Sequence, residues 1–161
     1  MDAEILLPMV RFHGWANDRI LTTAAALTDD ELRRPAPLDH GGAFQTLRHL
    51  VDVDWSWREL CTGHDVGRSY VWDFGYALDD LASIHAFCRE EDARLRAYVE
   101  GLDRAGLVEM VPVGTTSVPR ALVIAHVVNH GTQHRSELAR YLTDRGHSPG
   151  EIDLLDALDL P

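Results

Sequence analysis

The sequence has no lysine, only two cysteines and no long apolar run, and each scarcity excludes a class of protein. Without lysine there is no side-chain amine for a Schiff base or for a lysine nucleophile. Two cysteines, Cys61 and Cys88, are too few for a disulfide framework, which indicates a reducing cytoplasm. No segment reaches the roughly 18 apolar residues of a membrane-spanning helix, and the N-terminus is acidic where a signal peptide is basic. We therefore expect a cytoplasmic protein and exclude a secreted mini-protein and a membrane protein.

The charge is strongly one-sided. Acidic residues outnumber basic ones by 26 to 15, which gives a net charge of −11 at neutral pH. Such a surface repels phosphate backbones and anionic lipids, so nucleic acid and membrane surfaces are excluded as partners and a small-molecule substrate is expected. The 161 residues suit one domain, and we expect a single domain over residues 1–161.

Apolar residues recur at helical spacing in four segments, residues 4–27, 44–62, 78–100 and 119–144. A loop rich in glycine and aromatic residues, 64–76, separates the second and third. The segment 107–118 alone has strand-like character, and Pro112 limits it to an edge hairpin or an extended loop. Residues 152–158 have the length of one or two helical turns. The pattern predicts an all-α four-helix bundle with a short extended segment before the last helix, for which up-down-down-up connectivity is one arrangement.

Histidine is the residue whose placement indicates chemistry. His126, His130 and His134 lie at i, i+4 and i+8 in the fourth helix, where each step of four returns to nearly the same face. Two imidazoles at i and i+4 can bind one metal ion. The alternative is that these are hydrogen-bonded core histidines, because apolar residues continue the same stripe: Leu122, Val123, Leu138 and Tyr141.

A metal site needs a third ligand from another helix. His49 lies on the apolar stripe of the second helix and is the first candidate. His13 and His85 are the other candidates that face inward. The remaining histidines lie beside glycines or in loops, where we expect surface positions: His40, His64 and His147.

At this point the sequence resembles a known family. The second helix has a His-Leu…acid…Trp run, and residues 126–135 read His-Val-Val-Asn-His-x-x-x-His-Arg. Together with Trp-Ala-Asn at 15–17, Leu-Thr-Asp-Arg-Gly at 142–146 and Asp-Leu-Leu at 153–155, these runs resemble the DinB/YfiT-like superfamily of metal-binding four-helix bundles.

The resemblance implies a three-histidine site formed by His49, His130 and His134, holding zinc, nickel or a similar divalent ion. It leaves His126 a supporting or core role one turn earlier. It also implies a homodimer and a metal-dependent transferase or isomerase that activates a low-molecular-weight thiol as cosubstrate. Two alternatives stay open: a metal-dependent hydrolase, and a stress-linked protein that binds metal or a small ligand without turnover.

Three further residues adjoin the expected ligands. The family pattern usually has Gly-Gln where this chain has Ser136-Glu137, so Glu137 could orient a ligand histidine or act as a base. Asp52, three residues after His49, could be a fourth ligand or a base. Arg135 follows the last ligand on the side that should turn outward, where it would pair with an acidic neighbour or anchor an anionic substrate.

Overall fold

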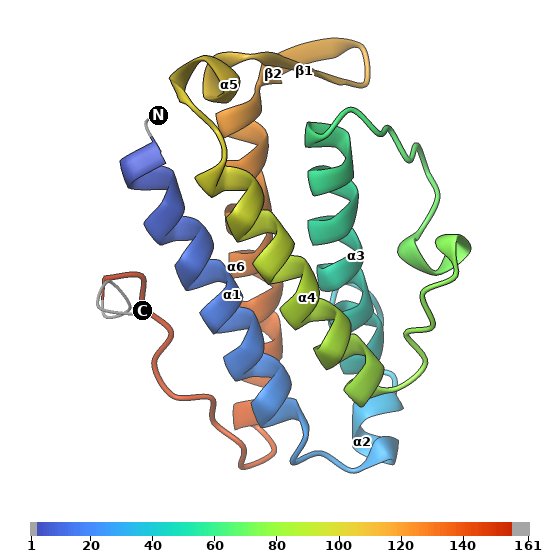
Figure 1. The fold of residues 1–161 in the computed structure, drawn as a ribbon. Helices are drawn as coiled ribbons and strands as arrows, with labels where there is room; N and C mark the ends of the chain where they lie inside the picture. Colours follow the sequence, from blue (N-terminus) through green and yellow to red (C-terminus); the bar gives the residue numbers. More distant parts are fainter. Residues whose placement is uncertain (1–2, 156–161) are drawn as a thin grey trace.

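A computed structural model describes residues 3–155, in which four long helices form the bundle that the periodicity predicts (Figure 1). They are α1 (Ala3–Ala24), α3 (Ala43–Cys61), α4 (Leu81–Glu100) and α6 (Arg120–Thr143). Helix α1 packs against α4 and α6, and α3 packs against the same two helices. The all-α prediction is confirmed, and the expected helices differ from the observed ones by a few residues at their ends.

The long connection between α3 and α4 determines the direction of the helices. It leaves α3 at the top of Figure 1, returns along the side of the bundle through the short 3₁₀ helix η1 (Val71–Phe74), and enters α4 at the bottom. Helices α3 and α4 therefore run parallel, whereas α1 and α6 run the opposite way. This is the up-down-down-up arrangement.

Short elements close the two ends of the bundle. Helix α2 (Asp29–Arg33) begins at a capping box, in which Thr28 and Glu31 satisfy each other's backbone N–H groups. Helix α5 (Arg104–Val108) precedes the antiparallel strands β1 (Met110–Val113) and β2 (Thr116–Pro119), which form the expected hairpin. The strand-like segment thus begins later than expected, because residues 107 and 108 complete α5.

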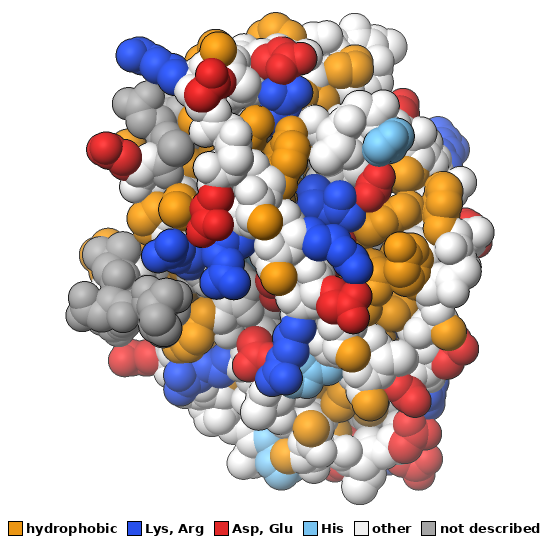
Figure 2. Space-filling model, in the orientation of Figure 1, with side chains coloured by type: hydrophobic (Ala, Val, Ile, Leu, Met, Phe, Trp, Pro, Cys, Tyr) orange, Lys and Arg blue, Asp and Glu red, His pale blue; other side chains and the backbone are white. Residues whose placement is uncertain are grey.

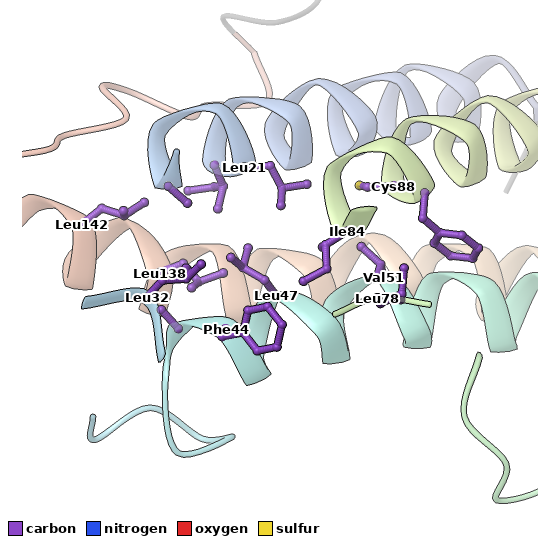
Figure 3. Close-up of a cluster of buried hydrophobic side chains, with 14 of the residues drawn as sticks. Leu21, Leu32, Phe44, Leu47, Val51, Leu78, Ile84, Cys88, Leu138 and Leu142 are labelled. Carbon is purple, nitrogen blue, oxygen red and sulfur yellow. The ribbon is translucent and has the colours of Figure 1, made fainter. Parts of the chain in front are cut away.

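Two large clusters of apolar side chains and a small third one, which contains Phe12 and Ala16, form the core. The larger lies at the α2 end, where side chains of α1, α3, α4 and α6 point toward one another (Figure 3). The smaller of the two large clusters lies at the hairpin end and includes Leu6, Val99, Ile124 and Val111 of β1. Leu122 was expected on the buried stripe, but it is 54% exposed. The expected helical turns at 152–158 are absent from residues 152–155, and residues 156–158 lie outside the described part.

The surface carries both signs of charge. Figure 2 shows arginine and acidic side chains interspersed over α1 and α4, with hydrophobic side chains gathered where the long connection crosses the bundle. Among the described helices, none is long and apolar enough to cross a membrane.

Candidate metal centre

Three histidines from two facing helices meet at one point. His49 comes from α3, and His130 and His134 come from successive turns of α6. The Nε2 atom of His130 lies 3.2 Å from Nε2 of His49 and 3.1 Å from Nε2 of His134. Two nitrogens bound to one tetrahedral zinc ion at about 2.0–2.1 Å are about 3.3 Å apart. His130 therefore lies at ligand spacing from both other rings.

The protonation of these rings suits metal binding. Burial lowers the pKa of His49 to about 4, and the neighbouring His40 ring adds to the shift because two positive rings would repel. Burial also lowers the pKa of His130 to about 4, with His134 as the next cause. At neutral pH both imidazoles are uncharged and have a lone pair for a cation.

His40 was expected at the surface, yet it joins this cluster. Its ring stacks on His49 with centroids 3.7 Å apart and lies 5.1 Å from the His134 ring. One ring nitrogen each from His40, His49 and His134 falls within 4.8 Å of the others, so the three form a possible metal site. His40 precedes α3 in a turn that includes Gly41, whose φ of +80° favours glycine. A turn has no periodicity, so sequence spacing could not place this histidine.

Glu137 lies on the other side of His134. Its Oε2 is 3.4 Å from His134 Nδ1, the nitrogen that does not face the cluster. Asp39 offers a second carboxylate within 4.8 Å of these two residues. Glu137 thus has the geometry of a residue that orients a ligand histidine, which is one of the two expected roles.

The carboxylate of Asp52 is used elsewhere. Its Oδ1 accepts a hydrogen bond from the backbone N–H of Val71 at 2.7 Å. Burial raises the pKa of Asp52, and the Val71 N–H partly opposes this shift. A residue three positions after His49 is rotated about 60° around the helix, toward the long connection. Asp52 therefore anchors that connection, and in the described residues no hydrogen bond joins it to the histidine cluster.

His126 lies at the edge of the cluster. The drift of about 40° for each step of four residues accumulates, so His126 is exposed whereas His134 is buried. Its ring centroid is 5.9 Å from His130 and 5.1 Å from Trp57. With Trp57 it lines a cavity of about 380 Å³ whose other walls are apolar: Val113, Val118, Leu122 and Val123.

Arg135 is buried, which corrects the expectation that it turns outward; only 3% of it is exposed. Its Nη1 donates to Asn17 Oδ1 at 2.8 Å and to His13 Nδ1 at 3.0 Å. The contact needs Gly131, because a Cβ there would lie 2.5 Å from Arg135 Nη1. The helix turns this residue toward α1 rather than toward solvent, and within residues 3–155 its hydrogen bonds go to Asn17, His13 and Thr132.

A second polar cluster surrounds Arg135 inside the bundle. Because arginine only donates, His13 Nδ1 accepts, and His13 Nε2 carries the proton that it donates to Asp54 Oδ2 at 2.8 Å. Asn17 Nδ2 donates to the same oxygen at 3.1 Å and to Asp92 Oδ1 at 3.3 Å. Sequence reasoning missed Asp54, Asn17 and Asp92 as a group, because each comes from a different helix.

The other inward candidates do not reach the histidine cluster. His13 belongs to the Arg135 network, and His85 lies 2.7 Å from Asp18 Oδ1. His64 is exposed, as expected, and lies beside Glu59. The cluster therefore consists of His40, His49, His130 and His134, with His126 at its edge.

Comparison with known proteins agrees with this architecture. The sequence profile of the DinB family matches residues 3–160. Comparison with curated proteins gave no match. The family match covers nearly the whole chain. The chain belongs to the DinB family.

Proposed function

We propose that the protein binds one divalent metal ion through His49, His130 and His134. The observation that carries this proposal is the position of His130 Nε2, which lies 3.2 Å from His49 Nε2 and 3.1 Å from His134 Nε2. The donor set also fits a cation, since the pKa values of His49 and His130 leave both rings neutral at pH 7. Imidazole ligands suit zinc and nickel, as well as copper and iron.

The proposed activity is transfer of a low-molecular-weight thiol to an electrophile. Three protein ligands leave an open position, whereas structural zinc is usually closed by four. A divalent ion with an open position supplies one chemical effect here: it favours the ionised form of a bound thiol. His40, which comes from a turn rather than a helix, lies against the rings of His49 and His134.

The chain's own residues have distinct tasks in this scheme. Glu137 Oε2 accepts a hydrogen bond from His134 Nδ1–H and so orients that ring. The cavity lined by Trp57 and His126 has no Asp, Glu or Arg in its lining, and the His126 ring lies 5.9 Å from the His130 ring. An electrophile with an apolar substituent suits this cavity better than a charged one.

A metal-dependent hydrolase is the second candidate. It needs a free carboxylate as a general base near the bound water. Glu137 lies beside His134 of the cluster and could serve as this base, whereas the Asp52 carboxylate is hydrogen-bonded to the Val71 N–H. The thiol reaction does not need such a base, because the ion itself favours the thiolate.

Metal stoichiometry tests the proposal directly. Mass spectrometry of the untagged protein should find about one divalent ion per chain in the wild type and none in His130→Ala. His64→Ala is the matched control, because its ring is 74% exposed and lies away from the cluster. A wild-type protein that stays metal-free after reconstitution contradicts the site.

Cobalt substitution then separates thiol chemistry from simple metal binding. Adding a low-molecular-weight thiol should give a strong sulfur-to-cobalt charge-transfer band if the thiol is a ligand. An unchanged spectrum, together with turnover of esters or amides above that of free metal, would favour the hydrolase.

A further inference from the structure

Among the described residues, four buried side-chain nitrogen and oxygen atoms have no hydrogen-bond partner; two are the Nε atoms of Arg48 and Arg120, and the other two belong to a histidine and an aspartate. One is Nδ1 of His130 on α6, and the other is Oδ1 of Asp54 on α3. Helices α3 and α6 pack directly against each other. Burying a donor or an acceptor without a partner is costly, so each such atom needs an explanation.

Independent contacts place Asp54 beside the helix turn that carries His130. Gly131, the residue after His130, lies directly against His13: a Cβ added to this glycine would lie 2.5 Å from His13 Cε1. His13 Nε2 is in turn 2.8 Å from Asp54 Oδ2. The negative charge of Asp54 also reaches His130, since it opposes the lowering of the His130 pKa that burial causes.

The free oxygen of Asp54 is held in place by its bonded one. Oδ2 accepts from both His13 and Asn17, and Arg135 donates to these same two residues. The carboxylate is 2% exposed and cannot turn away into water. Its Oδ1 therefore remains a buried acceptor without a donor.

A metal ion on Nε2 of His130 determines what the other ring nitrogen must do. The proton then resides on Nδ1, which becomes a donor. Histidines that bind metals almost always donate this proton to a carboxylate, a carbonyl or a water, and that bond orients the ring and raises its basicity. His134 has Glu137 in this position, whereas in the described part of the chain His130 Nδ1 has no hydrogen-bond partner.

We propose that Asp54 is the positioning residue of His130, with Oδ1 accepting the Nδ1 proton directly or through one water when Nε2 binds the metal. The inference rests on the proposed metal site and adds a task for the buried network. Hydrogen bonds from His13 and Asn17, which Arg135 contacts in turn, fix the Asp54 carboxylate, and Asp54 in turn orients the His130 ring. The network thereby links α1 to the candidate metal centre.

The variant Asp54→Asn tests this role with little change in shape. Its amide oxygen would have to accept from His13 and Asn17, which turns the NH₂ group toward the Nδ1–H of His130. Two hydrogen-bond donors would then face each other. We expect the metal dissociation constant, measured by chelator competition, to rise roughly 10–100-fold. Asp92→Asn is the matched control, because it changes the other carboxylate that Asn17 contacts. Its dissociation constant should stay within about threefold of the wild type.

A spectroscopic readout separates positioning from loss of stability. With saturating zinc, ¹⁵N-histidine NMR of the wild type should show a His130 Nδ1 proton protected from solvent exchange. The signal should be lost in Asp54→Asn and kept in Asp92→Asn. If Asp54→Asn does not fold, the wild-type spectrum alone tests the proposal. A His130 Nδ1 proton that exchanges rapidly with solvent would overturn it.

The two levels of proposal fail differently. If the wild type binds no metal, the proposed function and this inference both fail. If the wild type binds metal and Asp54→Asn binds it equally well, the site stands and the role of Asp54 is wrong.

Discussion

At the scale of single residues, the lowered pKa values of His49 and His130 link stability to pH. Both pKa values are about 4 in the folded chain, below the ordinary value of 6.5. Between these two values the unfolded chain therefore binds more protons than the folded chain. The free energy of unfolding falls as the pH falls, so the two rings favour the folded state least at acid pH. The metal-free protein should lose this contribution progressively as the pH falls from about 6.5 towards 4.

This pH dependence is measurable by urea unfolding at pH 7 and pH 5. We expect His49→Gln to show a smaller loss of unfolding free energy than the wild type, by about 1 kcal/mol after allowance for solvent screening. Asp92, whose pKa burial raises to about 6, shifts both proteins in the same direction and cancels in the comparison. Equal losses of unfolding free energy in both proteins would show that folding does not lower the pKa of His49.

At the scale of elements, one hydrogen bond ties the long connection to the bundle. Asp52 on α3 accepts the Val71 N–H, and Val71 is fully buried. Removing the acceptor leaves a buried backbone donor without a partner, which costs about 1–3 kcal/mol. Asp52→Ala should therefore loosen residues 62–80 while leaving the histidine cluster in place.

Hydrogen exchange checks this expectation. Amides around η1 should exchange faster in Asp52→Ala, and metal binding should be unchanged. Asp65→Ala is the control, because Asp65 caps Gly67 in the same connection but at an exposed position. Loss of metal from Asp52→Ala would instead make Asp52 a ligand.

At the scale of the whole molecule, a metal bound by His49, His130 and His134 would join α3 to α6. A ligand that binds only the folded state stabilises it by about 2.7 kcal/mol at 100 times its dissociation constant. For a domain of this size, each kcal/mol raises the melting temperature by about 2–4 °C. Zinc or nickel should therefore raise Tm by about 5–10 °C in the wild type.

The same experiment needs His130→Ala as its comparison. Its Tm should not respond to the metal, whereas His64→Ala should respond as the wild type does. A Tm shift of equal size in all three proteins would mean that the ion acts elsewhere on this acidic surface.

The sequence by itself determined the four helices and the shared face of His130 and His134. Both follow from short-range regularities: helical periodicity in the apolar residues and the i, i+4 spacing of two imidazoles. The choice of His49 as their partner followed from its apolar stripe and the family resemblance, and the structure brings the three rings together.

Only the tertiary structure decided the surroundings of that cluster. It brought His40 onto His49, directed Asp52 to the long connection and buried Arg135 against α1. These positions depend on which helices pack together and on where a loop crosses them. The contacts of His13 with Asp54 and with Arg135 join residues 41 and 122 positions apart and leave no periodic pattern in the sequence. They arise because buried polar groups must find partners on whichever helix lies beside them.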